Sequence, residues 1–407
     1  MLLLHGARKL DADGIVDDFW MLAEGTRITA VGTGTGWRHH VQGERRMFEE
    51  TTDAASVVPP TDRDSPSTPP TIEVVDAAGG WLTPGFIDLH GHGGGGFAFD
   101  DGADAIRSAL AEHRAHGTTR SVISLVANPP HVLAASLDAI ARLAADDPTV
   151  LGAHLEGPFL APSRKGAHNP DFLGVPTRHV LKQLLEASEG RLVQVTIAPE
   201  LPGALEAIDT FVASGVVVAV GHTDASLEVT REAFARGATL LTHAFNAMPG
   251  IHHRDPGPIV AAIDDDRVTL ELIADGVHVH PATLEAAFRA APGRIALITD
   301  AMAAAGAPDG PYRLGTLDVE VADGRALLAG TDTIAGSTLT QDAALRTSIA
   351  AGVDPVSAVT ALTSTPARVL GRSHDLGRLS PGYLADAVLL SQTYEAQRVI
   401  AEGRTLP

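Results

Sequence analysis

The sequence predicts an α/β protein, namely a (β/α)8 TIM-type barrel with a small β-sandwich domain formed by both chain termini. From residue 84 onward, short apolar runs alternate with amphipathic segments, which is the pattern of repeated strand–helix units. Both ends of the chain instead carry short apolar runs separated by glycine and Asp-Gly turns. A chain of 407 residues, 44% of them hydrophobic, is long enough for one large core and a smaller one.

The N-terminal part of the small β-domain is expected over residues 1–80, beginning with short strands in residues 1–35. Residues 38–70 are rich in Pro, Ser, Thr and charge and lack apolar periodicity. We therefore expect a disordered surface insertion there, with a lid or an interaction segment as the alternatives. The strand-and-turn character returns in residues 373–407, which complete the small domain.

The barrel is expected over residues 81–372, with eight strands separated by helices. Its strands are predicted at residues 85–89, 121–126, 150–155, 192–197, 216–220, 240–243, 269–274 and 295–299. Segments between them, such as AIRSALAEHRAHG and SLEVTREAFARGA, show helical spacing, and several end at glycine. A doubly wound open sheet would give a similar order of elements and is the alternative fold.

Composition excludes several classes of function. The net charge of −20 argues against a general nucleic-acid binder and against docking on an anionic membrane, and an anionic substrate would need a local cationic pocket. The chain has no cysteine, which excludes disulfides, thiolate nucleophiles and cysteine-ligated zinc. No apolar run reaches the ~18 residues of a membrane span, and the opening MLLLHGARKL is too short for a secretory signal. A cytoplasmic protein is expected.

Polar residues that suit a metal ion follow five of the predicted strands. Side chains two residues apart on a strand point the same way, so the first pair can converge on one ion. Because barrel enzymes keep their chemistry at these strand ends, the set predicts a metal site. The set consists of His90, His92, Glu156, His222, His243 and Asp300. Taken singly, each could be an ordinary loop or capping residue.

Six donors are more than one tetrahedral ion uses, so one or two divalent ions per subunit are expected, with zinc first and iron, manganese or cobalt as alternatives. In a two-metal centre Glu156 is the natural bridge, because each carboxylate oxygen can take one ion. Asp300 is the candidate catalytic carboxylate, which would take a proton from water and return it to the leaving group.

Eight motifs occur in this order: PGFIDLHGHGG, HLEGPF, KGAHNP, GHTDA, THAFNAM, ADGVHVHP, ITDAM and AGSTLT. Together they resemble the N-acetylglucosamine-6-phosphate deacetylases of the amidohydrolase superfamily, from residue 81 to the C-terminus and more loosely over residues 1–35. The resemblance implies hydrolysis of the acetamide of N-acetyl-D-glucosamine 6-phosphate to glucosamine 6-phosphate and acetate, in amino-sugar catabolism and cell-wall sugar recycling. It also implies that Glu156, His222 and His243 hold the ion common to the family, and that His90 and His92 add a second.

The same resemblance implies the residues that bind the sugar phosphate. His168 and His278 are similar to histidines that hold the substrate near its acetamide or hydroxyls, and His168 is also a catalytic candidate. Asn246, the amide of Ala247 and Arg254 match phosphate contacts, although Asp255 stands where the family usually has Glu. The remaining implied contacts are Ala167, Asp275, Gly276, Ala335, Gly336 and Ser337. The resemblance further implies a homodimer in which a neighbouring subunit completes the phosphate pocket.

Two other functions stay open at this point. A sister amidohydrolase could act on N-acetylgalactosamine 6-phosphate or on another amide, since pocket shape decides the choice of epimer. A non-catalytic sugar-phosphate sensor is the alternative from a different class, and the loss of Asp300 or His243 would favour it. Both residues are present.

Overall fold

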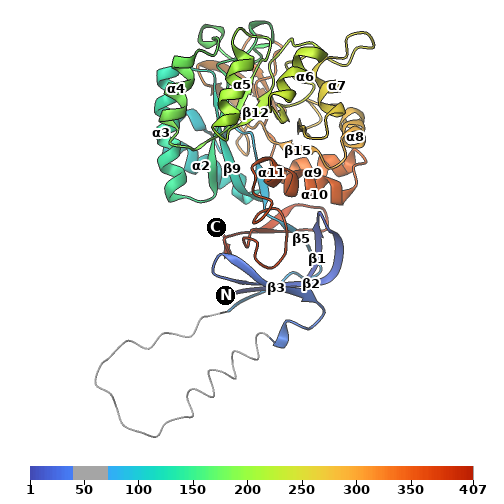
Figure 1. Ribbon diagram of the computed structural model, residues 1–407. Coiled ribbons are helices and arrows are strands. Elements are labelled where there is room, and N and C mark those ends of the chain that lie inside the picture. The colour runs from blue at the N-terminus through green and yellow to red at the C-terminus, as the bar shows by residue number, and fades with distance from the viewer. Residues whose placement is uncertain (40–71, 407) are drawn as a thin grey trace, which may run out of the picture.

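The computed structural model describes residues 1–39 and 72–406. It consists of a barrel of strands surrounded by helices, with a smaller sheet packed below it that contains both ends of the chain (Figure 1). Apart from its first two residues, the insertion predicted at 38–70 lies outside the described residues. The domain boundaries at residues 80 and 372 stay predictions.

Eight parallel strands form the barrel sheet, and they follow one another in chain order. Sequential order without a reversal distinguishes a barrel from a doubly wound sheet, so the predicted fold class is confirmed. All eight predicted strands are present, most with ends shifted by one or two residues. They are β6 (Phe86–Asp88), β9 (Thr118–Val126), β10 (Val150–Glu156), β11 (Leu192–Ile197), β12 (Val217–Val220), β13 (Leu240–Leu241), β14 (Thr269–Ile273) and β15 (Ile295–Ile298).

Side chains and loops join the first and last strands of this sheet at the end where the site lies. The carboxylate of Asp88, in β6, accepts hydrogen bonds from the amide and the hydroxyl of Thr299, just after β15, at 3.3 and 2.6 Å. The amide of Asp300 donates to the carbonyl of His90 at 2.8 Å. These bonds fix the ends of β6 and β15 against each other, and with them the residues that follow both strands.

Helices cover the outside of the barrel, and their buried faces pack on a continuous apolar core of strand and helix residues. Proline at the first or second position starts several of them, where its missing N–H costs nothing. The helices are α2 (Ala103–Ala115), α3 (Pro130–Asp146), α4 (Arg178–Ala187), α5 (Ala204–Ala213), α6 (Leu227–Ala235), α7 (Gly257–Asp264), α8 (Pro281–Ala290), α9 (Gln341–Ala350), α10 (Pro355–Leu362) and α11 (Ser364–Val369). None of the helices in the described ranges is long and apolar enough to cross a bilayer.

The smaller sheet combines strands from both ends of the chain, as the sequence predicts. Its order is β21-β20-β19-β5-β1-β2-β3, with β4 also paired to β1. It has its own core, centred on residues such as Leu4, Met21 and Ile400. The strands are β1 (Leu2–Asp11), β2 (Gly14–Glu24), β3 (Arg27–Thr33), β4 (Glu73–Asp76), β5 (Trp81–Pro84), β19 (Ala387–Leu390), β20 (Ala396–Ala401) and β21 (Arg404–Thr405).

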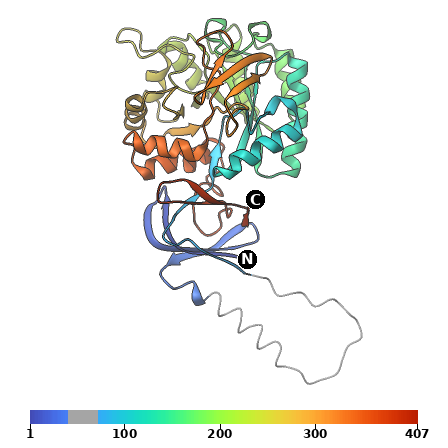
Figure 2. The ribbon, with the colours of Figure 1, turned by 180° about the vertical axis from the view of Figure 1, so that it is seen from behind.

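Short elements decorate the mouth of the barrel. A three-stranded antiparallel sheet, which we did not predict, is inserted between β15 and α9 and lies on the side of the barrel away from the smaller sheet (Figure 2). Its apolar side chains pack on Met302 and Ala335 next to the site. It comprises β16 (Gly310–Leu314), β17 (Leu317–Ala322) and β18 (Arg325–Leu328). The other short elements are β7 (Gly93–Gly94), β8 (Phe97–Ala98) and the 3-10 turns Phe99–Asp101, Pro162–Arg164 and Pro170–Phe172.

Candidate metal centre

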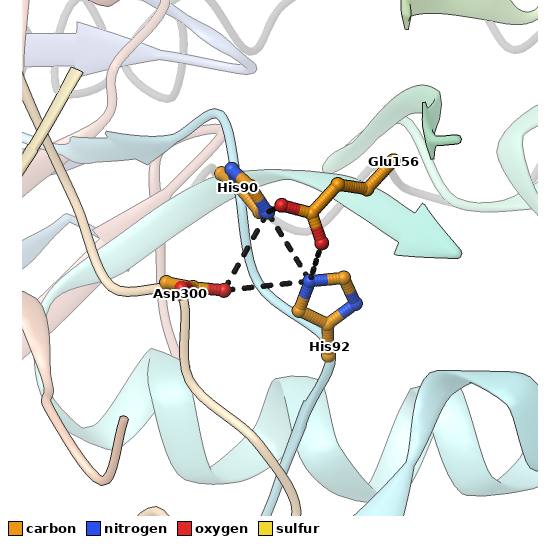
Figure 3. Close-up of side chains that lie close together, drawn as sticks. All are labelled: His90, His92, Glu156 and Asp300. Atoms are coloured by element: carbon orange, nitrogen blue, oxygen red, sulfur yellow. Dashed lines mark hydrogen bonds and ion pairs between the residues drawn. The ribbon is translucent and has the colours of Figure 1, made fainter. Parts of the chain in front are cut away.

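The structure brings the six predicted ligands together at the carboxyl ends of the barrel strands. They form two groups that share Glu156, and in each group one donor atom per residue lies within 4.8 Å of the others. Figure 3 shows the first group, in which His90 and His92 come from one segment and Glu156 and Asp300 from two others, and the side chains point toward one another. The groups are His90, His92, Glu156 and Asp300, and Glu156, His222 and His243. All are buried.

Three of these residues reach the centre through an unusual backbone conformation. His222, His243 and Asp300 each follow the end of a strand with positive φ angles of 47°, 26° and 47°. Non-glycine residues rarely adopt this conformation, which costs free energy and is found most often at functional sites. Here it turns each side chain from the strand direction toward the common centre.

The carboxylate of Glu156 lies between the two groups. Its Oε1 is 3.1 Å from Nε2 of His222, 3.0 Å from Nε2 of His243 and 3.3 Å from Nε2 of His90. Its Oε2 is 3.1 Å from Nε2 of His92. Oε1 therefore faces mainly His222 and His243, whereas Oε2 faces His92 of the other group. This is the arrangement expected of a bridging carboxylate.

The tautomer of His222 suits a metal ion in this site. Its Nδ1 lies 2.8 Å from the carbonyl of Arg164, which can only accept, so Nδ1 carries the proton of the neutral ring. The lone pair of Nε2 then faces the carboxylate of Glu156 at 3.1 Å and Nε2 of His243 at 3.0 Å. The lone pair of His222 Nε2 and the Glu156 oxygen repel each other at this distance unless positive charge lies between them.

The donor set fits a zinc-type ion. Ligands bound at about 2.0–2.1 Å in tetrahedral geometry lie about 3.4 Å apart. The Nε2 atoms of His90 and His92 are 3.1 Å apart, and Asp300 Oδ1 is 3.5 and 3.4 Å from them. Imidazole and carboxylate ligands suit zinc, iron, manganese and cobalt. The residues present therefore match a divalent metal centre, while its identity stays a prediction.

Electrostatics agree with this interpretation. Burial opposes ionisation of both carboxylates, but the histidines around them outweigh it. They hold the pKa of Glu156 well below its usual range and lower the pKa of Asp300 to about 2. Burial also opposes charging of His92, yet hydrogen bonds with Asp300 and Glu156 raise its pKa to about 9. The two anionic groups thus draw positive charge into the site.

His168 also lies in the centre. Its Nε2 is 3.3 Å from Oε2 of Glu156, and its ring meets that of His222 edge-on at 4.8 Å. The backbone amide of Ala127 donates to Nδ1 at 3.2 Å, so the proton of the neutral ring is on Nε2, which faces the site. Burial lowers the pKa of His168 to about 4, which keeps the ring neutral at pH 7.

The predicted loop residues 335–337 pack directly against Asp300. The amide of Ser337 donates to the Asp300 carbonyl at 2.7 Å, and its hydroxyl donates to the carbonyl of Thr299 at 2.5 Å. A Cβ atom on Gly336, whose φ is +66°, would meet the Asp300 carbonyl at 3.0 Å, which explains glycine there. Ala335 is buried beneath the three-stranded sheet, and Ala167 packs against the same cluster.

Other predicted substrate contacts lie next to the ligands in the chain. Asn246 donates its side-chain amide to the carbonyl of His243 at 3.3 Å, and Ala247 has a positive φ of 50°. Asp275 accepts from the amide of His278 and pairs with its Nδ1 at 2.6 Å, with Gly276 between them at φ 75°. Apart from the bonds of Asn246 to the backbone of His243, no hydrogen bond or ion pair joins these residues to the six ligands within the described part of the chain, and their roles stay predictions.

Arg254 lies on an exposed loop, where its guanidinium contacts the ring of His253 at 2.9 Å. Among the described residues it forms no ion pair, so it is free to bind an anion. The structure does not bring it into contact with the metal ligands, and its role also stays a prediction.

Sequence reasoning missed a layer of buried polar residues inside the barrel beneath the ligands. His154 uses both ring nitrogens, with Ser124 Oγ at 2.9 Å and Thr196 Oγ1 at 2.8 Å. Glu271 is fully buried beside Gln194. The signal was a charged residue inside an otherwise apolar strand, TLELI, whose alternate side chains face the barrel interior.

Comparisons with known proteins agree with the motifs. Residues 81–406 match the model of the amidohydrolase family. The chain is 41% identical to an N-acetylgalactosamine-6-phosphate deacetylase of Escherichia coli O157:H7, covering 79% of this chain and 87% of that protein. It is 37% identical to an N-acetylglucosamine-6-phosphate deacetylase of Danio rerio, covering 81% and 85%. A crystal structure of N-acetyl-D-glucosamine-6-phosphate deacetylase from Mycobacterium smegmatis superimposes with a TM-score of 0.86 at 39% identity, covering both chains completely.

Proposed function

Because this chain belongs to the amidohydrolase family, we propose that it is a metal-dependent deacetylase of N-acetyl-D-glucosamine 6-phosphate. It hydrolyses the acetamide to give D-glucosamine 6-phosphate and acetate, in amino-sugar catabolism and cell-wall sugar recycling. The single observation that carries the proposal is the pair of ligand groups that share Glu156, one of which includes Asp300. The similar proteins named for this reaction support the choice of substrate.

The centre holds one or two divalent ions, and we propose zinc. Glu156, His222 and His243 would hold the first ion, and His90, His92 and Asp300, with Glu156, the second. Such an ion, when bound, supplies Lewis acidity that activates water and polarises a carbonyl. The proposal includes a cytoplasmic homodimer, for which light scattering of the purified protein is the direct test of assembly.

The chain's own groups move the protons. Asp300 accepts a proton from the attacking water on a carboxylate oxygen and delivers it to the nitrogen of the leaving amine, so that the C–N bond can break. His168 presents its Nε2–H toward the centre, where it donates a hydrogen bond to an oxygen of the substrate. Asn246, the amide of Ala247 and Arg254 bind the phosphate, for which a guanidinium is well suited because it donates in pairs.

The remaining proposed contacts shape the sugar site. His278, held by Asp275 across Gly276, offers its Nε2 to a sugar hydroxyl. Residues 335–337, together with Ala167, close over the ring beside Asp300. These assignments rest on the family resemblance and on the positions of the residues around the mouth of the barrel.

The experiment is a release assay for acetate with the purified protein and four substrates. They are N-acetylglucosamine 6-phosphate, its galactosamine epimer, N-acetylglucosamine without phosphate and a cyclic amide. We expect the highest kcat/KM for the first and at least tenfold less without the phosphate. Higher turnover of the galactosamine epimer would reassign the substrate. Tight binding of the sugar phosphates without any acetate release would indicate a non-catalytic sensor.

A further inference from the structure

His90 has one ring nitrogen that the metal centre does not use. Its Nε2 faces Glu156 and Asp300, whereas Nδ1 lies on the opposite edge of the ring, away from the other ligands (Figure 3). The side chain is fully buried, and Nδ1 has no hydrogen-bond partner within the described part of the chain. An imidazole can bind a metal through Nε2 as a neutral ligand only when the proton is on Nδ1, which then needs an acceptor.

A buried carboxylate faces this nitrogen. Glu271, in β14, has no exposed surface, and its Oε1 accepts a hydrogen bond from the Gln194 amide at 2.9 Å. Its Oε2 is 3.5 Å from His90 Nδ1 and, like that nitrogen, has no hydrogen-bond partner among the residues that the structure describes. A buried donor and a buried carboxylate oxygen each cost free energy when they have no partner. A hydrogen bond between the two removes this cost.

The neighbouring groups cannot take this role. His154 packs edge-on against the His90 ring at 4.6 Å, but hydrogen bonds to Ser124 and Thr196 engage both of its nitrogens. Gln194 donates to Glu271 through its amide nitrogen, and no hydrogen bond within the described residues joins its oxygen to His90. Oε2 of Glu271 is therefore the acceptor within reach of His90 Nδ1.

We propose that Glu271 is a positioning residue for the His90 side of the metal centre. It accepts the Nδ1–H of His90, which fixes the tautomer and the ring angle so that the Nε2 lone pair points at the ion. This inference rests on the proposed metal centre and deepens it. It is specific to one side of that centre, because His222 is oriented by the carbonyl of Arg164 instead.

The test replaces the acceptor while keeping the side chain's length. Glu271→Met removes both oxygens and with them the acceptor for the Nδ1–H of His90. The metal affinity of the His90 site should fall by about 10–100-fold, which is the usual loss when the hydrogen-bond partner of a metal-ligating histidine is removed. Zinc bound per chain is measured by mass spectrometry during titration with a chelator, and the visible spectrum of the cobalt-loaded protein reports the geometry of the His90 site. Zinc bound by Glu156, His222 and His243 should change little.

Glu271→Gln provides the rescue. The side-chain oxygen of the introduced glutamine can accept the Nδ1–H of His90, provided that the side-chain amide of Gln194 rotates by about 180°. The oxygen of Gln194, which has no hydrogen-bond partner among the described residues of the wild-type protein, then accepts from the side-chain nitrogen of the introduced glutamine. We therefore expect this variant to stay within about threefold of the wild-type affinity. Thr196→Val is the matched control, since Thr196 is equally buried in the same barrel layer but bonds His154 and Thr242. If Glu271→Met does not fold, Glu271→Asp, which withdraws the carboxylate by one methylene, takes its place.

Unchanged zinc retention in folded Glu271→Met, or equal losses in the Met and Gln variants, would overturn the inference. So would a wild-type protein whose bound zinc is unaffected by His90→Ala, because no ion would then occupy this side. The measurement needs no substrate. A wild-type protein that retains zinc as expected but releases no acetate would therefore refute the proposed function and leave the role of Glu271 intact.

Discussion

Two of the regions that bury charged side chains are the mouth of the barrel and the junction of the barrel with the smaller sheet. At the junction, Arg120 of β9 forms a paired contact with Asp386, Nε to Oδ2 at 2.6 Å and Nη2 to Oδ1 at 3.1 Å. Its Nη1 donates to the carbonyl of Pro148 at 2.6 Å, and Glu402 lies 3.5 Å from Nη2. Asp386 also accepts from the amide of Glu402 at 2.8 Å.

The mouth differs because several of its buried polar atoms have no hydrogen-bond partner among the described residues. Nδ1 of His90, His92 and His243 has no hydrogen-bond partner in the described ranges, while the Nε2 atoms crowd around two carboxylates. A buried pair whose donors and acceptors match stabilises the fold through its own bonds. A buried cluster of metal-ligating atoms is instead stabilised only when a cation binds among them. The comparison predicts that changes at the mouth alter activity and metal binding, whereas changes at the junction alter stability.

The largest expected effect is on catalysis. Asp300→Asn keeps the size of the side chain but removes the base that takes the proton from water. We expect kcat to fall about 10³-fold, within the range for a positioned general acid or base. KM should change by less than threefold, and the zinc held by Glu156, His222 and His243 should remain. Steady-state kinetics with zinc analysis measures both.

The matched control is Asp224→Asn, an exposed carboxylate paired with Arg164 outside the ligand groups. It should keep more than half of the wild-type kcat. An Asp300→Asn enzyme with more than a tenth of the wild-type kcat would contradict the role of Asp300, although not the metal centre itself.

The second-largest expected effect is a loss of stability at the junction. Arg120→Met leaves Asp386 buried without its partner, and breaking a buried pair in this way costs about 3–5 kcal/mol. The free energy of unfolding is measured by urea denaturation, and kcat at 25 °C should stay near the wild-type value. The double variant Arg120→Met, Asp386→Leu should recover at least half of the lost stability, because no charge is then left unpaired. If the double variant lost as much stability as the two single variants added together, the loss in the single variants would not come from breaking the Arg120–Asp386 pair.

Strand geometry explains which residues of the site could be predicted from the sequence. Glu156, His222 and His243 are scattered along the chain, but each lies at or just after the end of a strand of one parallel barrel, and barrel closure brings such ends together. Glu271 was missed because its strand was interpreted as a uniform apolar run rather than as alternating inward and outward positions. The alternation LDVEV and the Asp323-Gly324 turn are typical of a hairpin and could have predicted the strands β17 and β18.

Loop residues could be predicted only by resemblance. Arg254 and His278 lie in loops whose conformation depends on local turns and on neighbours far away in the chain, and no periodicity places them. The junction pair was also beyond sequence reasoning. Nothing in the pattern of β9 or of the C-terminal segment indicates that Arg120 meets Asp386, 266 residues away.

A smaller effect distinguishes the two regions through ligand removal. Metal binds the folded mouth and not the unfolded chain, so zinc at 100 times its Kd stabilises the protein by about 2.7 kcal/mol. Removal of zinc with a chelator should lower the free energy of unfolding of the wild type and of Arg120→Met by equal amounts. Urea denaturation with and without zinc measures the difference. Unequal losses would mean that the junction and the mouth are coupled, and equal stability with and without zinc would contradict a built metal site.

The smallest effect is a dependence of stability on pH at a third, partly exposed cluster. His116, just after α2, lies 3.1 Å from Asp342 of α9, which also accepts from Arg346 and Thr340 at 2.8 and 2.7 Å. The hydrogen bond with Asp342 raises the pKa of His116 above 6.5. Burial opposes ionisation of Asp342, but its bonds with His116, Arg346 and Thr340 hold its pKa well below 3.8.

The raised pKa of His116 means that its contribution is complete below about pH 6.5 and is lost as the pH rises through the folded-state pKa. The lowered pKa of Asp342 means that its contribution is present above about pH 4 and is lost as the pH falls through the folded-state value. We therefore expect His116→Gln to cost up to about 1 kcal/mol at pH 5.5 and little at pH 9, since the pair is partly solvated. Urea denaturation of both proteins at pH 5.5, 7 and 9 measures this difference. A constant difference across that range would show that His116 acts at this position by packing rather than by charge.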